Sequence, residues 1–184
     1  MIIGITGTLG AGKGTVVEIL KKKGFSHYSV REFLIEEIKK RGLPVNRDSM
    51  VLVGNNIRRK NSPSYIVEKL YEKAKNYGGD SVIESIRAIG EAQALRKKEN
   101  FYLFSVDADI EKRYDRIKKR KLNSDFVSYE KFIEDEKREM KNTDPSKQSL
   151  LDCIKLADFK LENNGTISEL EKKVDKILAN LEIK

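Results

Sequence analysis

The chain has 184 residues, 39% of them hydrophobic, which is enough for one compact domain with a substantial core and too little for two. One cysteine and one histidine exclude an internal disulfide framework and a zinc cluster built from these residue types. The 37 basic and 29 acidic residues give a net charge of +8, but the lysines are spread over every predicted helix, as on solvated faces, so nucleic acid is an unlikely main partner.

The sequence also bears on membranes and targeting. Met1 is followed directly by what reads as a core strand, without a basic leader or a cleavable apolar stretch, and a run of about 18 apolar residues occurs nowhere. We therefore expect a cytoplasmic protein without a membrane partner. The sequence does not predict the oligomeric state.

The predicted elements begin with a buried strand over residues 1–6, where β-branched residues precede a glycine-rich turn. A helix over residues 15–23 follows the turn. Ser29 and Glu32 have capping-box spacing and open a second helix, which Gly42 ends. Two more helices are predicted before the next convincing strand, over residues 48–60 and 62–74.

The second half of the chain alternates strands with helices. Strands are predicted over residues 80–85, 101–106 and 159–161. Helices are predicted over residues 90–98, 110–121, 129–141 and 148–156, and Thr166 and Glu169 have capping-box spacing for a terminal helix. This alternation predicts an α/β fold, a three-layer doubly wound parallel sheet with right-handed crossovers, as a single domain over residues 1–184.

The glycine-rich turn after the first strand carries the strongest chemical signal. It has the G-x-x-x-x-G-K spacing between a predicted strand and a predicted helix, where backbone N–H groups and the helix dipole bind phosphates. Lys13 adds a charge for the β and γ phosphates and the Thr15 hydroxyl a ligand for Mg²⁺. A turn that merely starts a helix explains neither residue. We expect ATP to contact Gly7, Thr8, Gly10, Ala11, Gly12, Lys13, Gly14, Thr15 and Val16.

The sequence Gly12-Lys13-Gly14-Thr15, with glycine directly after the lysine, resembles adenylate kinase and the related nucleoside monophosphate kinases. The resemblance implies a P-loop nucleotide kinase fold with a short lid. It implies ATP and Mg²⁺ as cofactors, a small-molecule nucleotide as acceptor and a catalytic role for Lys13. It also implies that residues 31–77, where three predicted helices follow one another, bind the acceptor.

The segment Ser81–Arg87 is similar to the strand of those kinases that ends in Asp-Gly and leads to an arginine. The resemblance implies that Arg87 holds the acceptor phosphate and takes part in catalysis. Glu84 stands where the family has Asp. The resemblance implies that Glu84 is an anionic ligand for Mg²⁺-bound water, with a side chain longer than that of Asp.

The segment Asp115–Arg120 resembles the start of the kinase lid, which corresponds here to residues 119–127. The resemblance implies that Arg116 lies on the adenine and that Arg120 reaches the phosphates as an ATP-binding and catalytic residue. Arg113 shares their helical face at spacing i, i+3 and i+7, and guanidinium groups both stack on bases and fork onto phosphates. A solvated basic helix is the alternative interpretation.

Two positions farther along match less specific features. Arg138 follows the lid, where related kinases bring another arginine to the transferring phosphoryl group, and an exposed pairing with Glu134 is the alternative. Residues 157–166 resemble the end of dephospho-coenzyme A kinase, where an Asn-rich loop lies beside the adenine. This resemblance implies that Asn164 contacts ATP.

The chain departs from the family pattern near Glu32. Monophosphate kinases usually have Asp followed three places later by a phosphate-clamping Arg, whereas here Glu32 is followed by Ile35. We therefore expect Arg31, Arg58 or Arg59 to replace this clamp, with Arg31 and Arg58 as the acceptor-binding candidates. An ordinary solvated helix end also explains Arg58 and Arg59.

Two functional hypotheses follow. The first is an ATP-dependent kinase that phosphorylates a nucleotide-like acceptor: a nucleoside or deoxynucleoside monophosphate, or dephospho-coenzyme A. Such catalysis needs positioning and charge neutralisation rather than a covalent nucleophile. The second is a nucleotide-binding regulatory module with slow or no transfer. The missing arginine at Ile35 and the replacement of Asp by Glu84 leave this hypothesis open. A polynucleotide kinase would rest on the net charge alone.

Overall fold

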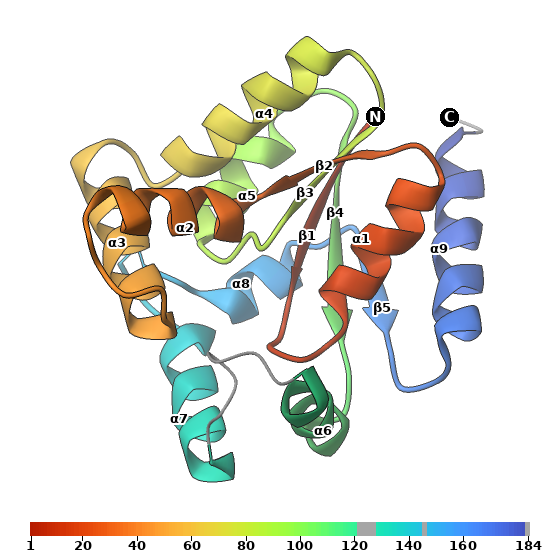
Figure 1. The fold of residues 1–184 in the computed structure, drawn as a ribbon. Coiled ribbons are helices and arrows are strands. Elements are labelled where there is room, and N and C mark those ends of the chain that lie inside the picture. Colours follow the sequence, from red (N-terminus) through yellow and green to blue (C-terminus); the bar gives the residue numbers. More distant parts are fainter. Residues whose placement is uncertain (121–127, 145–146, 183–184) are drawn as a thin grey trace.

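A computed structural model describes residues 1–120, 128–144 and 147–182 of the chain. Its centre is a parallel sheet of five strands in the order β2-β3-β1-β4-β5. The strands are β1 (Ile2–Gly7), β2 (Ser26–Ser29), β3 (Ser81–Glu84), β4 (Phe101–Asp107) and β5 (Phe159–Glu162). Helices cover both faces, as Figure 1 shows. The predicted doubly wound parallel sheet is therefore confirmed.

Helices connect consecutive strands and form the two outer layers. They are α1 (Lys13–Lys22), α2 (Val30–Lys40), α3 (Arg47–Lys60), α4 (Tyr65–Tyr77), α5 (Ile89–Arg96), α6 (Ile110–Arg120), α7 (Tyr129–Met140), α8 (Leu150–Lys155) and α9 (Ile167–Glu182). In Figure 1, α1 and α9 lie on one side of the sheet, and α4, α5 and α8 on the other. Among the described residues, none of these helices is both long and apolar enough to span a membrane.

The central strand explains why the core has two halves. Successive side chains of a strand point to opposite faces. Ile3 and Ile5 therefore join the apolar cluster under α1 and α9, while Ile2 joins the cluster under α2, α3, α4 and α5. Burial of apolar side chains on both faces fixes the register of β1 between β3 and β4.

Two predicted helix starts are confirmed, and two local predictions need correction. The Ser29 hydroxyl accepts the N–H of Glu32, and Thr166 and Glu169 form a reciprocal capping box. Helix α4 begins after Ser64 rather than at residue 62, because residues 62–65 form a turn closed by a backbone hydrogen bond. Strand β2 was not predicted, because its sequence, Ser-His-Tyr-Ser, lacks an apolar alternation.

The parallel pairing places the ends of three strands at one edge of the sheet. Gly7 pairs with Val106, and Ile5 pairs with Glu84. The turn after β1 and the segment after β3 consequently lie side by side, and Figure 1 shows α6 and α7 beyond these strand ends. In open α/β sheets, ligands bind in the crevice at this edge.

Candidate active site

The turn between β1 and α1 has a backbone that requires glycine. Gly7, Gly10 and Gly12 have φ angles of 134°, 79° and 98°. A Cβ added to Gly7 would lie 2.0 Å from the carbonyl oxygen of Val106, and one added to Gly10 would lie 2.4 Å from that of Arg113. The glycines therefore allow the close approach and the turning backbone that an anion-binding loop needs.

Helix α1 begins directly at the end of this loop. Gly12 is its N-cap, and the first turn is Lys-Gly-Thr-Val, so the positive end of the helix dipole meets no carboxylate of that turn. The Lys13 ammonium donates to the carbonyl oxygens of Gly7 and Thr8, each at 2.7 Å. The side chains of Ala11 and Val16 are fully buried, so these two residues offer a ligand their backbone groups.

One large cavity opens beside the loop. Its volume is about 910 Å³, near the upper end of the range for small-molecule sites. It extends from the segment after β5, past the loop, to α2, α3 and α7. The sequence-predicted residues whose atoms line it are Gly10, Gly12, Lys13, Gly14, Thr15, Arg31, Arg58, Glu84, Arg87 and Arg116. The structure thus brings the loop and the predicted acceptor side into one space.

At one end of the cavity, Arg116 is fixed between two loops. Its Nη2 donates to the carbonyl oxygen of Asn163 at 2.8 Å, and the Asn163 amide donates to that of Ala11 at 2.8 Å. Asn163 lines the cavity, whereas the predicted Asn164 points elsewhere and exchanges two hydrogen bonds with Asp109. The contact of Asn164 with ATP stays a prediction, and its neighbour Asn163 is the residue whose atoms line the cavity.

The carboxylate of Glu84 lies at the end of β3, beside the loop. The Ser29 hydroxyl donates to Oε1 at 2.7 Å, and the Ser85 hydroxyl donates to Oε2 at 3.0 Å. Ser85 has a φ of 68°, a left-handed conformation that costs a serine free energy. It stands where the resembling kinases have glycine, so the serine keeps the backbone shape and adds a hydroxyl.

The donor set around Glu84 suits magnesium. Mg²⁺ prefers oxygen ligands and usually takes only one or two from the protein, with water and phosphates completing the shell. Glu84 and Thr15, which both line the cavity, offer a carboxylate and a hydroxyl. Within residues 1–120, 128–144 and 147–182, no group of three or more His, Cys, Asp or Glu gathers as a metal site. The donor types of Thr15 and Glu84 therefore fit a magnesium ion that takes its other ligands from a triphosphate and water.

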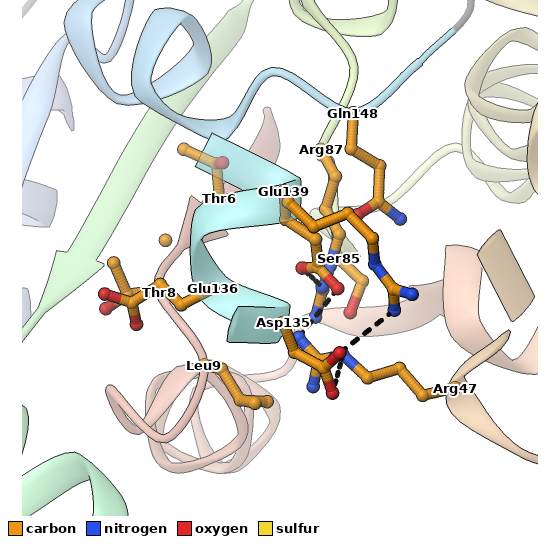
Figure 2. Close-up of polar contacts among 12 residues, drawn as sticks. Thr6, Thr8, Leu9, Arg47, Ser85, Arg87, Asp135, Glu136, Glu139 and Gln148 are labelled. Carbon is orange, nitrogen blue, oxygen red and sulfur yellow. Dashed lines mark hydrogen bonds and ion pairs between the residues drawn. The ribbon is translucent and has the colours of Figure 1, made fainter. Parts of the chain in front are cut away.

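Elsewhere in the cavity lining, two arginines meet one carboxylate. Arg87 pairs through Nη1 with Oε2 of Glu139, and Arg47 pairs through Nη2 with Oε1 at 2.6 Å. Figure 2 shows these three side chains together, with Gln148 and Ser85 beside them. Burial raises the pKa of Glu139, but the charges of Arg87 and Arg47 outweigh burial and hold its pKa below the usual carboxyl value.

Arg58, an acceptor-binding candidate from the sequence, lies in a buried ion pair at the cavity lining. It lines the cavity but is only 2% exposed, and its Nε and Nη2 lie 2.8 and 2.7 Å from Oε1 of Glu91. The second oxygen, Oε2, accepts the N–H groups of Arg87 and Ala88, each at 3.1 Å. Arg58 is thus tied, through Glu91, to the backbone that carries Arg87.

Other candidates lie at or outside the cavity. Arg31 lines it with an exposed side chain, while Arg59 is exposed and does not line it. Arg138 is half-exposed, does not line the cavity, and pairs with Asp48 at 3.0 Å and Asp135 at 3.2 Å rather than with Glu134.

The predicted lid falls mainly outside the described part of the chain. Residues 121–127 lie outside it, and so does the side chain of Arg120. Arg113, on the same helix, is 5% exposed and pairs with Glu136, away from the cavity lining.

Sequence reasoning missed several polar residues of the cavity lining besides Asn163, and three of them gather around one carboxylate or beside it. They are Arg47, Glu139 and Gln148. Arg47 is the first residue of α3, one residue before the predicted start of that helix. Glu139 directly follows Arg138, the candidate that the sequence predicts in α7. Only the fold brings them together.

Comparisons with known proteins agree with this picture. A family model described as an AAA domain matches residues 3–141. The chain is 29% identical over 191 residues to a UPF0200 protein of Thermococcus sibiricus, covering 100% of this chain and 97% of that protein. It is 29% identical over 189 residues to the UPF0200 protein MJ1399 of Methanocaldococcus jannaschii, covering 98% and 90%.

Solved structures share the fold. Shikimate kinase from Acinetobacter baumannii, in complex with shikimate, has a TM-score of 0.62 at 17% identity and covers 100% of this chain and 95% of its own. TT1252 from Thermus thermophilus has a TM-score of 0.61 at 24% identity, covering 98% and 97%. The five-stranded parallel sheet with this strand order is the nucleoside monophosphate kinase type of P-loop fold.

Proposed function

This chain belongs to the AAA domain family, and we propose that it is an ATP- and Mg²⁺-dependent phosphotransferase that moves the γ-phosphoryl group of ATP to a nucleotide-like acceptor. The observation that carries the proposal is a cavity lined both by Lys13 and Thr15 of the phosphate-binding loop and by Arg47 and Arg87. Phosphoryl transfer needs donor and acceptor groups to meet in one space with their charge neutralised.

The donor nucleotide would lie along the loop. Its phosphate oxygens would accept hydrogen bonds from the backbone N–H groups at the start of α1. The Lys13 ammonium, which now donates to the carbonyl oxygens of Gly7 and Thr8, would donate to phosphate oxygens instead. Its base would lie toward Arg116, which the Asn163 carbonyl holds in place. When bound through Thr15 and Glu84, magnesium would neutralise charge on the transferring group.

The chain's own groups would perform the remaining work by positioning. Lys13 and Arg87 both bring positive charge to the cavity in which the phosphoryl group would transfer. Arg58 would act through Glu91 on the backbone of Arg87. The resemblance alone supports parts for Arg120 and Arg138 at the transferring group, for Asn164 near the donor base and for Arg31 at the acceptor.

The acceptor is proposed as a nucleoside or deoxynucleoside monophosphate, or dephospho-coenzyme A. Arginines in the cavity lining favour an anionic compound, and Val30, Leu34 and Met50 add apolar surface to the same lining. A second candidate function is a regulatory nucleotide-binding module. The pairing of Arg87 with Glu139 favours it, because the arginine meant for an acceptor already has an anionic partner.

The test is ATP consumption by the purified protein with Mg²⁺ and each member of a panel of nucleoside monophosphates, deoxynucleotides and dephospho-coenzyme A. A kinase should consume ATP at least about a hundredfold faster with one of these than with none. The Lys13→Ala protein is the control for contaminating kinases. Tight ATP binding without acceptor-dependent turnover would favour the regulatory module instead.

A further inference from the structure

Two arginines from distant parts of the chain converge on one buried carboxylate. Arg47 is the first residue of α3, Arg87 follows β3, and Glu139 lies in the last turn of α7. Figure 2 shows Glu139 reaching from α7 toward Arg87, with Arg47 approaching from another element. All three residues line the cavity, so this cluster belongs to the active-site space and not to the apolar core.

The two guanidinium groups hold different oxygens of the same carboxylate. Arg47 contacts Oε1 and Arg87 contacts Oε2, so the distance between the two guanidinium groups suits an anion of about the size of a carboxylate. A phosphate monoester presents oxygens with similar spacing and carries up to one more negative charge. Guanidinium groups bind such oxygens with short, charge-assisted hydrogen bonds. The arrangement therefore fits a phosphate at least as well as it fits Glu139.

The charges of the cluster are unequal. The side chains of Arg47 and Arg87 are 21% and 20% exposed, and Glu139 is 4% exposed. Asp135 lies 3.5 Å from Nε of Arg47, but Lys131 and Arg138 also pair with it. Glu139 thus serves both arginines, Asp135 is a shared counter-charge for Arg47, and Lys13 adds positive potential at Glu139. An additional negative charge at this place is favourable.

A second observation points to a ligand at the same place. Gln148 lines the cavity next to Arg87, and its segment is tied to Arg87 because the Ser149 N–H donates to the Arg87 carbonyl at 2.9 Å. The Gln148 side chain is more than nine-tenths buried, and its Oε1 has no hydrogen-bond partner among the residues that the structure describes. A buried carbonyl oxygen without a donor is costly, and a donor on a bound molecule would satisfy it.

The alternatives to Arg47 fit less well. Arg58 forms a buried ion pair with Glu91, and Arg59 does not line the cavity. Arg31 lines it from an exposed position. Among the ion pairs of the described residues, Arg47 is the arginine that shares an anion with Arg87, so it is the candidate for the place left open by Ile35.

We propose that Arg47 and Arg87 form a two-arginine clamp for a phosphate monoester of the acceptor, and that Glu139 occupies the clamp until this phosphate displaces its carboxylate. The clamp rests on the proposed kinase function and narrows the acceptor to compounds that carry such a phosphate. Gln148 then faces the part of the acceptor next to the phosphate. Glu139 keeps the arginines paired and in place in the empty site, and competes with the acceptor for them.

The test uses the full chain with Mg²⁺ and a saturating non-hydrolysable ATP analogue, so that the loop is filled, and titrates inorganic phosphate by calorimetry. Wild type should bind phosphate at a second site. Arg47→Ala and Arg87→Ala should each weaken this binding about tenfold or more, the scale of one charge-assisted contact. Arg41→Ala, an exposed arginine outside the cavity, should bind like wild type. Glu139→Gln should bind phosphate more tightly, because the competing charge is gone.

The controls separate the clamp from the wider proposal. If Arg47→Ala fails to fold, Arg47→Lys keeps a charge for Glu139 but loses the fork, and weaker phosphate binding is still expected. A folded Arg47 variant that binds phosphate like wild type, or weaker binding by Glu139→Gln, would overturn the clamp. A wild type that binds the analogue but no phosphate overturns the clamp alone, whereas a wild type that does not bind the analogue overturns the proposed function.

Discussion

The buried pair of Arg58 and Glu91 makes the most quantitative prediction. Glu91 is fully buried and Arg58 is 2% exposed, so replacing Glu91 by Gln leaves a guanidinium without a counter-charge in the interior. Breaking a buried ion pair from one side costs about 3–5 kcal/mol. The Gln carbonyl can still accept from the backbone N–H groups of Arg87 and Ala88, but its NH2 group then faces the Arg58 donors, so the loss combines the missing charge with a missing acceptor.

The assay is equilibrium unfolding in urea followed by circular dichroism, since the chain has no tryptophan. Glu91→Gln should lower the free energy of unfolding by about 3 kcal/mol or more, with an unchanged slope. The double variant Arg58→Met/Glu91→Gln should recover most of this loss, because no unpaired charge remains. Glu37→Gln, which removes the partner of Lys40 in an exposed pair, is the control and should leave the midpoint unchanged within error.

Two results would refute this reasoning. Glu91→Gln could unfold at the same urea concentration as wild type, which would mean that water or another group compensates Arg58. Alternatively, the two substitutions could simply add, which would mean that the side chains do not depend on each other. If the reasoning holds, Glu91→Gln should also raise the KM for the acceptor more than the KM for ATP, because Glu91 anchors the backbone of Arg87.

Four further predictions can be checked separately. Lys13→Ala should lose triphosphate binding at an unchanged melting temperature, and unchanged affinity in calorimetry would contradict the P-loop role. Thr15→Ala should reduce the gain in nucleotide affinity on adding Mg²⁺, and an equal gain in both proteins would exclude Thr15 from the metal. Ser85→Gly should gain about 1 kcal/mol of stability by relieving its left-handed strain, whereas Ser85→Ala should not, and both should weaken the Mg²⁺ effect through Glu84. Burial raises the pKa of the Cys153 thiol, so iodoacetamide should modify it only on unfolding, and fast labelling of native protein would contradict its burial.

The sequence predicted the fold because its signals are local and agree with one another. The apolar strand before Gly7 and the helix after Gly12 frame a loop whose glycines need positive φ angles, and one loop of this kind already indicates a doubly wound sheet. Strand β2 escaped prediction because its four residues are polar and its pairing with β3 is decided by neighbours far along the chain.

The acceptor side was harder to predict because it depends on convergence. Arg58 has the same helix-end setting as Arg59 in sequence, yet one is buried against Glu91 and the other is exposed. Arg47 and Glu139 look like ordinary charged residues at the ends of polar helices. Their pairing requires α3 and α7 to meet at the carboxyl edge of the sheet, and no local pattern in the sequence encodes that meeting.

The two edge strands of the sheet affect how the protein associates with other copies at high concentration. Its two outermost strands, β2 and β5, have four residues each, and β5 carries Lys160 and Glu162 with exposed side chains. Short, charged edge strands are poor templates for adding a strand from another chain. We therefore expect that concentrated native protein resists fibril growth by edge pairing, and that any contact between copies uses helical surfaces instead.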